Sequence, residues 1–527
     1  MEFDYIVIGA GSAGSALAAR LIEKNASVLL LEAGRKERLH ITRVPASQIM
    51  TVGNRRYDWK YQTEPDPSRN GLVEAWPRGR VPGGSSAING MIFIRGAARD
   101  YDAWASLGNT GWGWADVLPY FRKLETSDAD KDNAYRGSLG PLRVSGLRWR
   151  HPISAKFIKS LMEAGIPYVD DLNGRSHDGV AWTQGSTRTG VRHSTFDAFI
   201  RPKLRNALLT FMDDTLVERV VMDGNRATGV QMMRGDRSMT AKARRGVIVS
   251  AGAINSPHLL MLSGIGDPVA LARHGIAPVI DNPEVGLNLM EHPGLGIRAE
   301  LDLSTGNKHA RSLGAALAFA NWALTRNGFL SGPIAQVLAF LKSNADQHEA
   351  DLQFHLFPFG YFKKDGRMIV PDRNLVTILT NVNYPKSRGR LELKSADPRH
   401  PIAIYPRLLE HPDDLNSLLR GLDWVRKIAA TPPFGSHVLS LLEIPSAGAS
   451  RADDEAYVRG ATLPLLHPVG TCRMGGDPTA VVTPDLKVRG AEGLWVADAS
   501  IFPRHIAGNT NATAIMIGER ASDLIHP

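Results

Sequence analysis

Three glycines near the start of the chain, Gly9, Gly11 and Gly14, have the GxGxxG spacing of a dinucleotide-binding turn. Gly9 permits a tight turn, Gly11 lets a pyrophosphate approach the backbone, and Gly14 allows a helix to pack closely on a sheet. Glu32 follows Gly14 by 18 residues, where a carboxylate can accept hydrogen bonds from both hydroxyls of an adenine-linked ribose and disfavours a 2′-phosphate. These four residues predict a site for a dinucleotide.

The segments around these glycines supply the elements that must position them. Residues 3–8 form an apolar run of strand length, residues 12–24 repeat apolar side chains at helical period, and residues 27–31 form a second apolar run. In this order the phosphate sits at the helix amino terminus, where free N–H groups and the helix dipole favour negative charge. The combination argues against the alternative that the glycines only form a turn in an unrelated α/β protein.

The composition is that of a globular protein large enough for two or more domains, with 527 residues, 43% hydrophobic and 22% charged. The net charge is +9, but acidic residues stand among the basic ones, so we expect a solvated basic surface and no nucleic-acid partner. Cys472 is the only cysteine, which excludes an intramolecular disulfide and a CxxC redox pair. The histidines lack the HxxxH and HExxH spacings, so we expect no metal site.

The sequence shows no targeting or membrane-spanning segment. The first Arg is Arg20, inside the predicted helix, so a basic region of a signal peptide is not visible. The longest uncharged apolar stretch, residues 246–266, contains Ser250, Asn255 and Pro257 among several glycines, and we expect it to form a strand, a turn and a short helix. We therefore expect a cytoplasmic protein without a transmembrane segment.

Two further glycine-rich segments are candidates for holding a cofactor. Residues 79–96, GRVPGGSSAINGMIFIRG, would expose several backbone N–H groups to an anionic or carbonyl-rich group. Residues 250–266, SAGAINSPHLLMLSGIG, place a glycine turn between a strand and a helix that contains a proline near its start.

With these motifs in this order, the chain resembles the glucose-methanol-choline (GMC) family of FAD-dependent oxidoreductases along nearly its whole length. Residues 79–96 resemble the first family signature, with Pro82 where an aliphatic residue is usual. Residues 285–293, VGLNLMEHP, resemble the family's GxNLxDHP turn, with Glu291 in place of the usual Asp. The second family signature is matched by Gly252, Ser256, Pro257, Ser263, Gly264 and Gly266. The two segments that form the family's catalytic face are resembled by HPVGTCRMG at 467–475 and by residues 493–525. In appearance the chain is nearest to bacterial members that oxidise choline, sorbose or aromatic alcohols.

The resemblance implies an α/β fold with two discontinuous domains. A Rossmann-like FAD-binding domain is expected from residues 1–150, 203–295 and 463–527. A second α+β domain for the substrate, built on an antiparallel sheet, is expected from residues 151–202 and 296–462. The alternation of residue types in 390–394 is typical of a strand of that sheet.

The resemblance also implies the cofactor, because the GxGxxG turn alone does not distinguish FAD from NAD. It assigns the ADP half to Gly9, Gly11, Ser12, Gly14, Glu32 and Ala33, and the adenine to the backbone of Val217. It assigns the flavin half to Gly84, Ser85 and Asn89, the pyrophosphate or ribityl region to Asp498 and Ala499, and the flavin ring to Asn509, Thr510 and Asn511. Each of these small residues, taken alone, could instead only form a turn. Some family members attach the flavin covalently to a histidine, and Ile88 stands at that place, so we expect non-covalent FAD.

Two residues are implied to carry the chemistry. Oxidation of an alcohol removes the hydroxyl proton while hydride leaves the adjacent carbon for flavin N5, and a base with a pKa near neutrality serves this best. The family's base corresponds to His467, and its usual partner, histidine or asparagine, corresponds to Asn509, whose amide can donate to the substrate oxygen. The alternatives are that His467 has only a structural role or that His505 is the base. We interpret His193, His258, His292 and His355 as structural or pocket-lining residues.

The predicted reaction is FAD-dependent oxidation of a primary alcohol to an aldehyde. The bacterial resemblance favours a dehydrogenase that uses a quinone or another electron acceptor over an oxidase that reduces O₂ to H₂O₂. A hydroxynitrile lyase and a non-enzymatic flavin-binding protein are the remaining alternatives. A candidate substrate pocket, suited to an apolar or aromatic alcohol, consists of Phe354, Phe357, Phe359, Tyr361 and Leu466, although alternating aromatic residues also occur in ordinary core strands.

Overall fold

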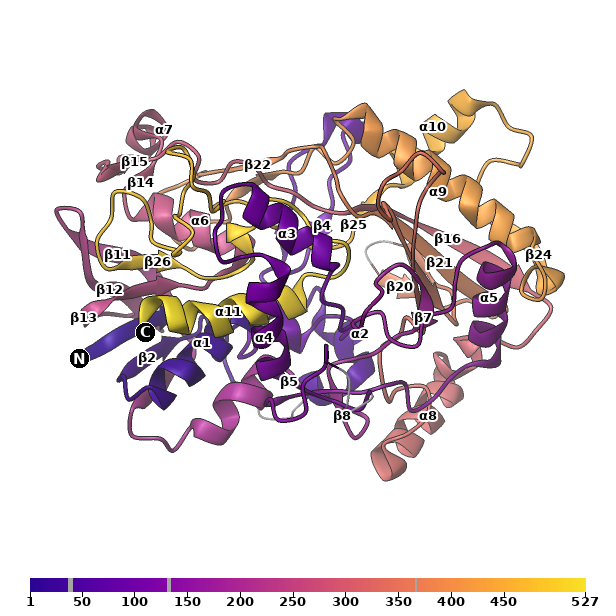
Figure 1. The fold of residues 1–527 in the computed structure, drawn as a ribbon, viewed down its shortest axis with the longest axis horizontal. Helices are drawn as coiled ribbons and strands as arrows, with labels where there is room; N and C mark the ends of the chain where they lie inside the picture. Colours follow the sequence, from indigo (N-terminus) through magenta and orange to yellow (C-terminus); the bar gives the residue numbers. More distant parts are fainter. Residues whose placement is uncertain (37–40, 130–133, 365–366) are drawn as a thin grey trace.

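Two seven-stranded sheets organise the molecule, which is a computed structural model describing residues 1–36, 41–129, 134–364 and 367–527. The sheet that contains the amino-terminal strand lies on the left of Figure 1, and the other sheet lies on the right. Both chain ends lie beside the first sheet, and the hydroxyl of Tyr5 donates to the carbonyl oxygen of Ile525 at 3.2 Å. The carboxyl-terminal segment thus returns to the strand that starts the chain.

The first sheet is parallel at its centre. Its five parallel strands are β10 (Leu209–Met212), β2 (Val28–Leu31), β1 (Glu2–Ile8), β13 (Arg237–Val249) and β26 (Leu494–Val496). An antiparallel pair, β12 (Arg226–Arg234) and β11 (Thr215–Asp223), extends it beyond β13. All four residues of β2 are buried, as expected for a central parallel strand covered on both faces. The helices α1 (Ser12–Glu23) and α11 (Asn511–Ile525) pack together on this sheet.

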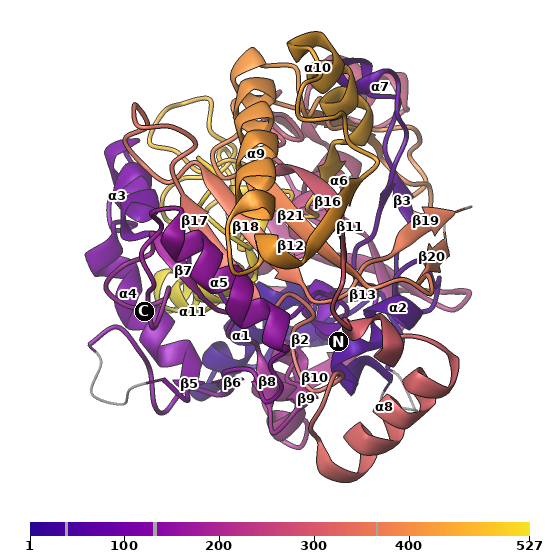
Figure 2. The same cartoon turned by 90° about the vertical axis from the view of Figure 1, so that its right-hand side faces the viewer.

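The second sheet is antiparallel. Its strand order is β24 (Val438–Leu442), β16 (Pro293–Leu301), β21 (Leu375–Val382), β18 (Leu352–Phe357), β17 (Val337–Leu341) and β7 (Gly179–Trp182), and β25 (Leu463–Pro464) also pairs with β16. Figure 2 shows α9 (Pro412–Ala430) and α5 (Pro152–Glu163) in front of this sheet. The sheet therefore draws on residues between 179 and 464, whereas the exact limits of the domains stay a prediction.

The two faces of the second sheet have different environments because side chains alternate along a strand. On β18, Leu352, Phe354 and Leu356 pack with α5 and α9 in one apolar cluster. His355 and Phe357 point to the other face, where they line a cavity between the two sheets. One face thus supplies a core, and the opposite face supplies a wall of the candidate site.

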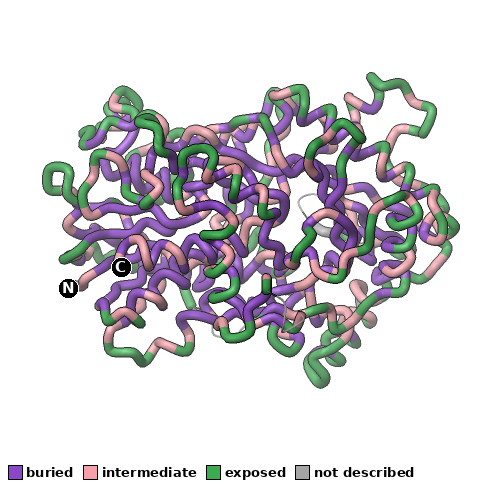
Figure 3. The backbone as a smooth tube through the Cα atoms, in the orientation of Figure 1, coloured by how far each residue is buried: buried purple, intermediate pink, exposed green. Residues whose placement is uncertain are grey.

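The remaining helices and short strand pairs lie outside the two large sheets. The other helices are α2 (Gln48–Thr51), α3 (Ala98–Ser106), α4 (Trp114–Leu124), α6 (Gly252–Leu262), α7 (Pro268–Arg273), α8 (Ser312–Thr325) and α10 (Arg451–Ala461). The paired short strands are β3 (Tyr61–Gln62) with β4 (Ala75–Trp76), β5 (Glu125–Ser127) with β6 (Leu142–Val144), β8 (Thr187–Arg188) with β9 (Val191–Arg192), β14 (Ile265–Gly266) with β15 (Ile280–Asp281), β19 (Phe362–Lys364) with β20 (Arg367–Ile369), and β22 (Arg390–Glu392) with β23 (Ala403–Tyr405). Figure 3 shows that the strands of both sheets are mostly buried, while exposed segments lie at the periphery.

The structure confirms the strand, helix and strand predicted around the first glycines, with β1, α1 and β2 in that order. It also confirms a strand, turn and short helix in residues 246–266, where β13 leads into α6. The strand predicted at 390–394 exists as β22, but it pairs with β23 instead of joining the large antiparallel sheet. The reason is that Leu391 is buried in the core of the first sheet. No helix in the described ranges is long and apolar enough to cross a membrane.

Candidate active site

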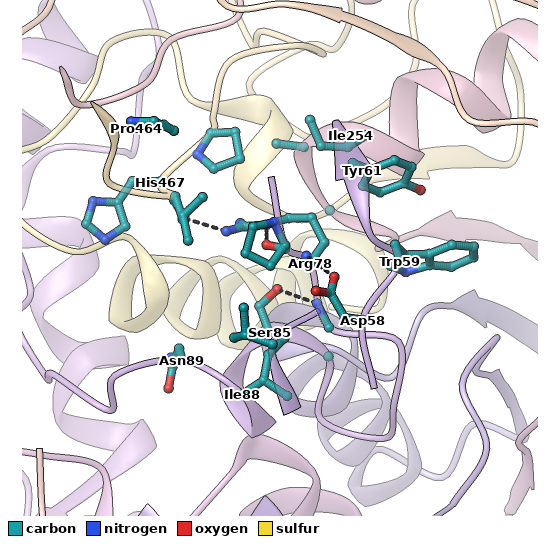
Figure 4. Close-up of a pocket in the computed structure, with 18 of the residues that line it drawn as sticks. Asp58, Trp59, Tyr61, Arg78, Ser85, Ile88, Asn89, Ile254, Pro464 and His467 are labelled. Atoms are coloured by element: carbon teal, nitrogen blue, oxygen red, sulfur yellow. Dashed lines mark hydrogen bonds between the residues drawn. The ribbon is translucent and has the colours of Figure 1, made fainter. Parts of the chain in front are cut away.

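A cavity of about 1580 Å³ lies between the two sheets and receives residues from both. The first sheet contributes the turn after β1 and the end of β2, and the second sheet contributes the free face of β16, β18 and β21. Figure 4 shows part of its lining, with His467 and Asn89 at one side and Trp59 and Tyr61 at the other. A volume of this size accommodates a dinucleotide together with a small substrate.

The amino termini of α1 and α11 both open on this cavity. Gly11, Ser12 and Ala13 line it at the start of α1, and Thr510 and Asn511 line it at the start of α11. Neither helix receives a hydrogen bond from a capping side chain in the described part of the protein. Their first N–H groups are therefore available to a negatively charged group such as a pyrophosphate.

The three glycines of the first turn have the geometry that the sequence predicts. Gly9 has a φ of 102°, and a Cβ on Gly14 would lie 2.0 Å from the carbonyl oxygen of Gly9, so a side chain is excluded there. A Cβ on Gly11, in contrast, meets no described atom within 4 Å and would project into the cavity. The turn thus fits a ligand that touches the backbone at Gly11, and this fit supports a bound dinucleotide.

Glu32 lies in the cavity wall at the end of β2. Its carboxylate accepts hydrogen bonds from the backbone N–H groups of Ala10, at 3.1 Å, and Gly34, at 2.7 Å. Burial raises the pKa of this carboxyl to about 7, against the lowering effect of these two hydrogen bonds. Ala33 and Val217 line the same part of the cavity. The group is thus fixed in place and retains lone pairs for ribose hydroxyls.

The flavin-half residues predicted from the sequence line the cavity as well. Ser85 accepts a hydrogen bond from the N–H of Gly79 at 3.1 Å, and Asn89 accepts one from the guanidinium of Arg192 at 3.0 Å. Gly84 and Ile88 lie beside them. Figure 4 shows Ile88 and Asn89 near Ser85, so this part of the cavity wall carries an aliphatic side chain.

Asp498 and Ser12 connect distant parts of this cavity wall. Asp498 accepts hydrogen bonds from the N–H groups of Gly252, at 2.8 Å, and Ser500, at 2.8 Å, and its neighbour Ala499 also lines the cavity. The hydroxyl of Ser12 donates to the Oδ1 atom of Asn511 at 2.7 Å. The carboxyl-terminal segment is thereby joined to the turn after β1 and to the glycine-rich segment 250–266.

His467 and Asn509 meet at the wall of the cavity. The Nδ2 atom of Asn509 lies 2.9 Å from the Nε2 atom of His467, and the Nδ1 atom of His467 lies 3.1 Å from the Nδ1 atom of His292. The Nε2 atom of His292 is 3.0 Å from the carbonyl oxygen of Asn383 and 3.1 Å from that of Ile506. The sequence predicted that His467 and Asn509 act as partners, but it did not predict that His292 contacts His467.

These contacts assign the protons of the two imidazoles. A neutral imidazole carries one N–H, and Nε2 of His292 must carry it because both of its partners are carbonyl oxygens. Its Nδ1 atom is then an acceptor, so Nδ1 of His467 carries the proton of that ring. Nε2 of His467 is left unprotonated, and its lone pair accepts from the amide of Asn509. This is the protonation state that a general base needs.

The surroundings keep His467 neutral. Burial lowers its pKa well below the ordinary value, and the nearby His292 acts in the same direction. Glu291 accepts hydrogen bonds from the backbone N–H groups of His467, at 2.8 Å, and His292, at 2.9 Å, so the replacement of Asp by Glu retains an anchor for both histidines. Burial raises the pKa of the Glu291 carboxyl to about 8, against the effect of Arg78. Arg78 in turn donates to the carbonyl oxygen of Leu466 at 2.6 Å.

His505, the alternative base, is turned away from the cavity lining. Its Nε2 atom lies 3.0 Å from the carbonyl oxygen of His467, and the N–H of Ile506 donates to its Nδ1 atom at 3.0 Å. Its ring centroid is 3.6 Å from that of His292. Both of its nitrogens are engaged by backbone groups, so this histidine supports the segment that carries His467.

The structure places three of the five predicted substrate-pocket residues at the cavity and the other two away from it. Phe357, Tyr361 and Leu466 line the cavity, but Phe354 and Phe359 do not. Phe354 lies on the opposite face of β18 in the apolar core, and the ring of Phe359 packs against Phe329. The alternation of side chains along β18 places Phe354 and Phe357 on opposite faces of the sheet. Only the packing of α5 and α9 decides which of these faces belongs to the apolar core. Sequence reasoning missed Arg298, and it left His355 as structural or pocket-lining; both face the cavity from the sheet.

Comparisons with known proteins agree with this geometry. The GMC oxidoreductase family model matches residues 3–294 with its amino-terminal part and residues 385–518 with its carboxyl-terminal part. The chain belongs to the GMC oxidoreductase family.

Related GMC oxidoreductases cover the whole chain. An alcohol dehydrogenase [acceptor] of Pseudomonas putida is 37% identical over 536 residues, which are 99% of this chain and 95% of the relative. An oxygen-dependent choline dehydrogenase of Brucella anthropi is 37% identical over 531 residues, 100% of this chain and 96% of the relative. The crystal structure of pyridoxine 4-oxidase from "Mesorbium loti" has a TM-score of 0.89 at 27% identity, covering 99% of this chain and 98% of that one. As a member of this flavoprotein family, the GMC oxidoreductase described here uses FAD, and its glycine turn and helix termini fit that cofactor.

Proposed function

We propose that this GMC oxidoreductase oxidises a primary alcohol to an aldehyde, with His467 as the general base. The observation that carries the proposal is the unprotonated Nε2 atom of His467, which accepts from the amide of Asn509 at the cavity wall. FAD, when bound, supplies the acceptor for the hydride that leaves the alcohol carbon. The family relationship and the names of the relatives agree with oxidation of a CH–OH group.

His467 and Asn509 have separate roles in the removal of the hydroxyl proton. The substrate hydroxyl takes the place of the Asn509 amide as the donor to Nε2 of His467, which accepts the proton as the O–H bond breaks. The Nδ2 group of Asn509 donates to the substrate oxygen while alkoxide character develops on it. The electron pair of the adjacent C–H bond leaves as hydride, the C=O bond forms, and the products are an aldehyde, one proton on His467 and a reduced acceptor.

His292 acts through His467. Its Nδ1 atom accepts the Nδ1–H of His467 at 3.1 Å, which fixes the tautomer and orients the ring. When His467 becomes positively charged, its Nδ1–H still donates to Nδ1 of His292, so the ring keeps its orientation. The low pKa that burial imposes on His467 favours the return of the proton to solvent or product after each turnover.

The cofactor is proposed to be bound without a covalent bond to the protein. Ile88 lines the cavity at the position that corresponds to the attached histidine of some family members, and its side chain cannot form such a bond. Residues 1–150, 203–295 and 463–527 are proposed as the FAD-binding domain, with 151–202 and 296–462 as the substrate domain. If acid precipitation leaves the yellow chromophore on the protein, the non-covalent assignment is wrong.

We favour a dehydrogenase that passes electrons to a quinone or a similar acceptor. The relative from Pseudomonas putida is named an acceptor-dependent alcohol dehydrogenase, whereas the structural relative is an oxidase. Phe357, Tyr361 and Leu466 favour an apolar or aromatic alcohol. Stoichiometric H₂O₂ in air would contradict the dehydrogenase assignment.

The experiment that tests the function is anaerobic mixing of the FAD-loaded protein with benzylic, aliphatic, sugar and choline alcohols. The proposal predicts that a primary alcohol bleaches the flavin absorbance and yields the aldehyde. A protein that leaves the flavin oxidised with every alcohol, or that releases an aldehyde from a cyanohydrin without bleaching, would overturn it in favour of a binding protein or a lyase.

A further inference from the structure

Helix α8 is uncharged and mostly apolar, and yet it lies on the surface. Its sequence, SLGAALAFANWALT, contains no charged residue. Leu313, Leu317, Phe319 and Leu324 are exposed by 72%, 61%, 52% and 85%. Figure 2 shows the helix projecting from the lower edge of the molecule, and the same region is largely exposed in Figure 3. A large apolar helix face is normally buried, so the exposed leucine side of α8 indicates a contact with another apolar phase.

The helix is held against the body of the protein by one narrow side. Among the residues of α8 whose burial the structure describes, Ala318 and Trp322 are the buried ones, and the indole N–H of Trp322 donates to the carbonyl oxygen of Gly190 at 2.7 Å. The guanidinium of Arg326 lies 4.4 Å from the centroid of the Trp322 ring. These contacts fix which side faces the protein, and the leucines are left on the side that faces away.

The charges around α8 indicate the chemistry of its partner. No acidic residue occurs between Asp302 and Asp346, whereas Lys308, Arg311 and Arg326 stand next to the two ends of the helix. Arg311 pairs with Asp372, and Lys308 and Arg326 are exposed. A second copy of this chain would present the same positive charges and be repelled, but anionic lipid headgroups would be attracted while the leucines enter the acyl region.

We propose that α8 docks the protein on the surface of an anionic lipid bilayer. The helix lies in the plane of the interface with its leucines inserted and the flanking basic residues at the headgroups. This arrangement requires no spanning segment, and it depends on neither the identity of the alcohol nor the role of His467.

The position of the cavity agrees with this orientation. Val52 lines the cavity and is 44% exposed, so it lies at an opening, and Met50 beside it on α2 is 61% exposed. Both α2 and α8 lie in the lower right part of the molecule in Figures 1 and 2. A bilayer that receives α8 would thus lie near an opening of the cavity.

The experiment is co-sedimentation of the purified FAD-loaded protein with two kinds of vesicle, phosphatidylcholine alone and phosphatidylcholine mixed with phosphatidylglycerol. We expect binding to the anionic vesicles, weaker binding to the neutral ones, and loss of binding at high salt because headgroup attraction is screened. The variant Leu317→Glu/Leu324→Glu should bind about tenfold less because two inserted leucines become charged.

The matched control is Leu139→Glu/Leu439→Glu, which makes the same change in charge at leucines that are 96% and 65% exposed elsewhere. The control should bind as the wild type does, and both variants should retain the flavin spectrum and the thermal midpoint. The proposal is overturned if the wild type fails to sediment with anionic vesicles, or if the α8 variant binds equally well. It is also overturned if light scattering shows a wild-type dimer that the α8 variant converts to monomers, because a second copy then covers the helix.

Discussion

The side chains of His292 and His467 face each other through their Nδ1 atoms at 3.1 Å, although 175 positions separate them in the sequence. The two carbonyl oxygens at Nε2 of His292 decide the direction of the hydrogen bond. It runs from His467 to His292 and leaves the lone pair of His467 on the side of the cavity. The backbone carbonyl groups of Asn383 and Ile506 thus determine which nitrogen of His467 carries the proton.

Replacing His292 should impair the reaction without abolishing it. His292→Phe removes the acceptor of the His467 Nδ1–H, so the ring loses its preferred tautomer and orientation. We expect flavin reduction to slow by about 10- to 100-fold, the usual effect of removing a group that orients a reacting histidine. His292→Asn retains an acceptor oxygen and should recover part of the loss. Equal rates for the wild type and His292→Phe would show that the contact does not matter.

Asn509 should contribute less than the base. Asn509→Ala removes the amide that donates to the developing alkoxide, and we expect flavin reduction to slow by about 100-fold, the lower range for one lost donor. Asn509→His restores a donor and should be faster than the alanine variant. Rapid-reaction absorbance under anaerobic conditions measures both. An alanine variant that reacts as fast as the wild type would remove Asn509 from the account.

The pH dependence of kcat/KM should reflect the buried imidazole. Burial and His292 lower the pKa of His467 below its ordinary value of 6.5, so the neutral base persists as the pH falls through 6.5 and is protonated only at lower pH. We therefore predict that the acidic limb of the profile lies below pH 6.5. Measurements with saturating acceptor and a range of alcohol concentrations give this profile. A limb at or above pH 6.5 would be inconsistent with the buried, neutral state.

Gly11 offers a way to separate cofactor binding from folding. A Cβ at this residue meets no described atom within 4 Å but enters the cavity, so Gly11→Ala should fold normally and bind FAD more weakly. Gly146→Ala is the control, because its Cβ is also free of contacts but the residue lies on the surface. Flavin content after gel filtration and the circular dichroism spectrum measure the two effects. If both variants keep the full flavin content, the pyrophosphate does not approach Gly11.

The sequence predicted features that depend on neighbours in the chain. The turn from Gly9 to Gly14 joins one strand to one helix, so spacing alone is informative, and β1 and α1 formed as expected. The face on which Phe354 lies depends on the packing of α5 and α9, which the period of a strand does not reveal. The contact between His292 and His467 depends on the course of two loops, and Leu391 joined the core of the first sheet for a similar reason. Local patterns thus predicted the elements, and tertiary packing decided which residues meet.

The central claim is that His467 removes the hydroxyl proton, and the most direct test is the anaerobic rate of flavin bleaching by an alcohol in His467→Ala. The account predicts a decrease of about 10² to 10⁴, the usual contribution of a general base, with FAD still bound and with the acidic limb of the pH profile abolished. Added imidazole should restore part of the rate by entering the space that the ring vacates. A variant that retains its flavin and bleaches it within a few-fold of the wild-type rate would contradict the account.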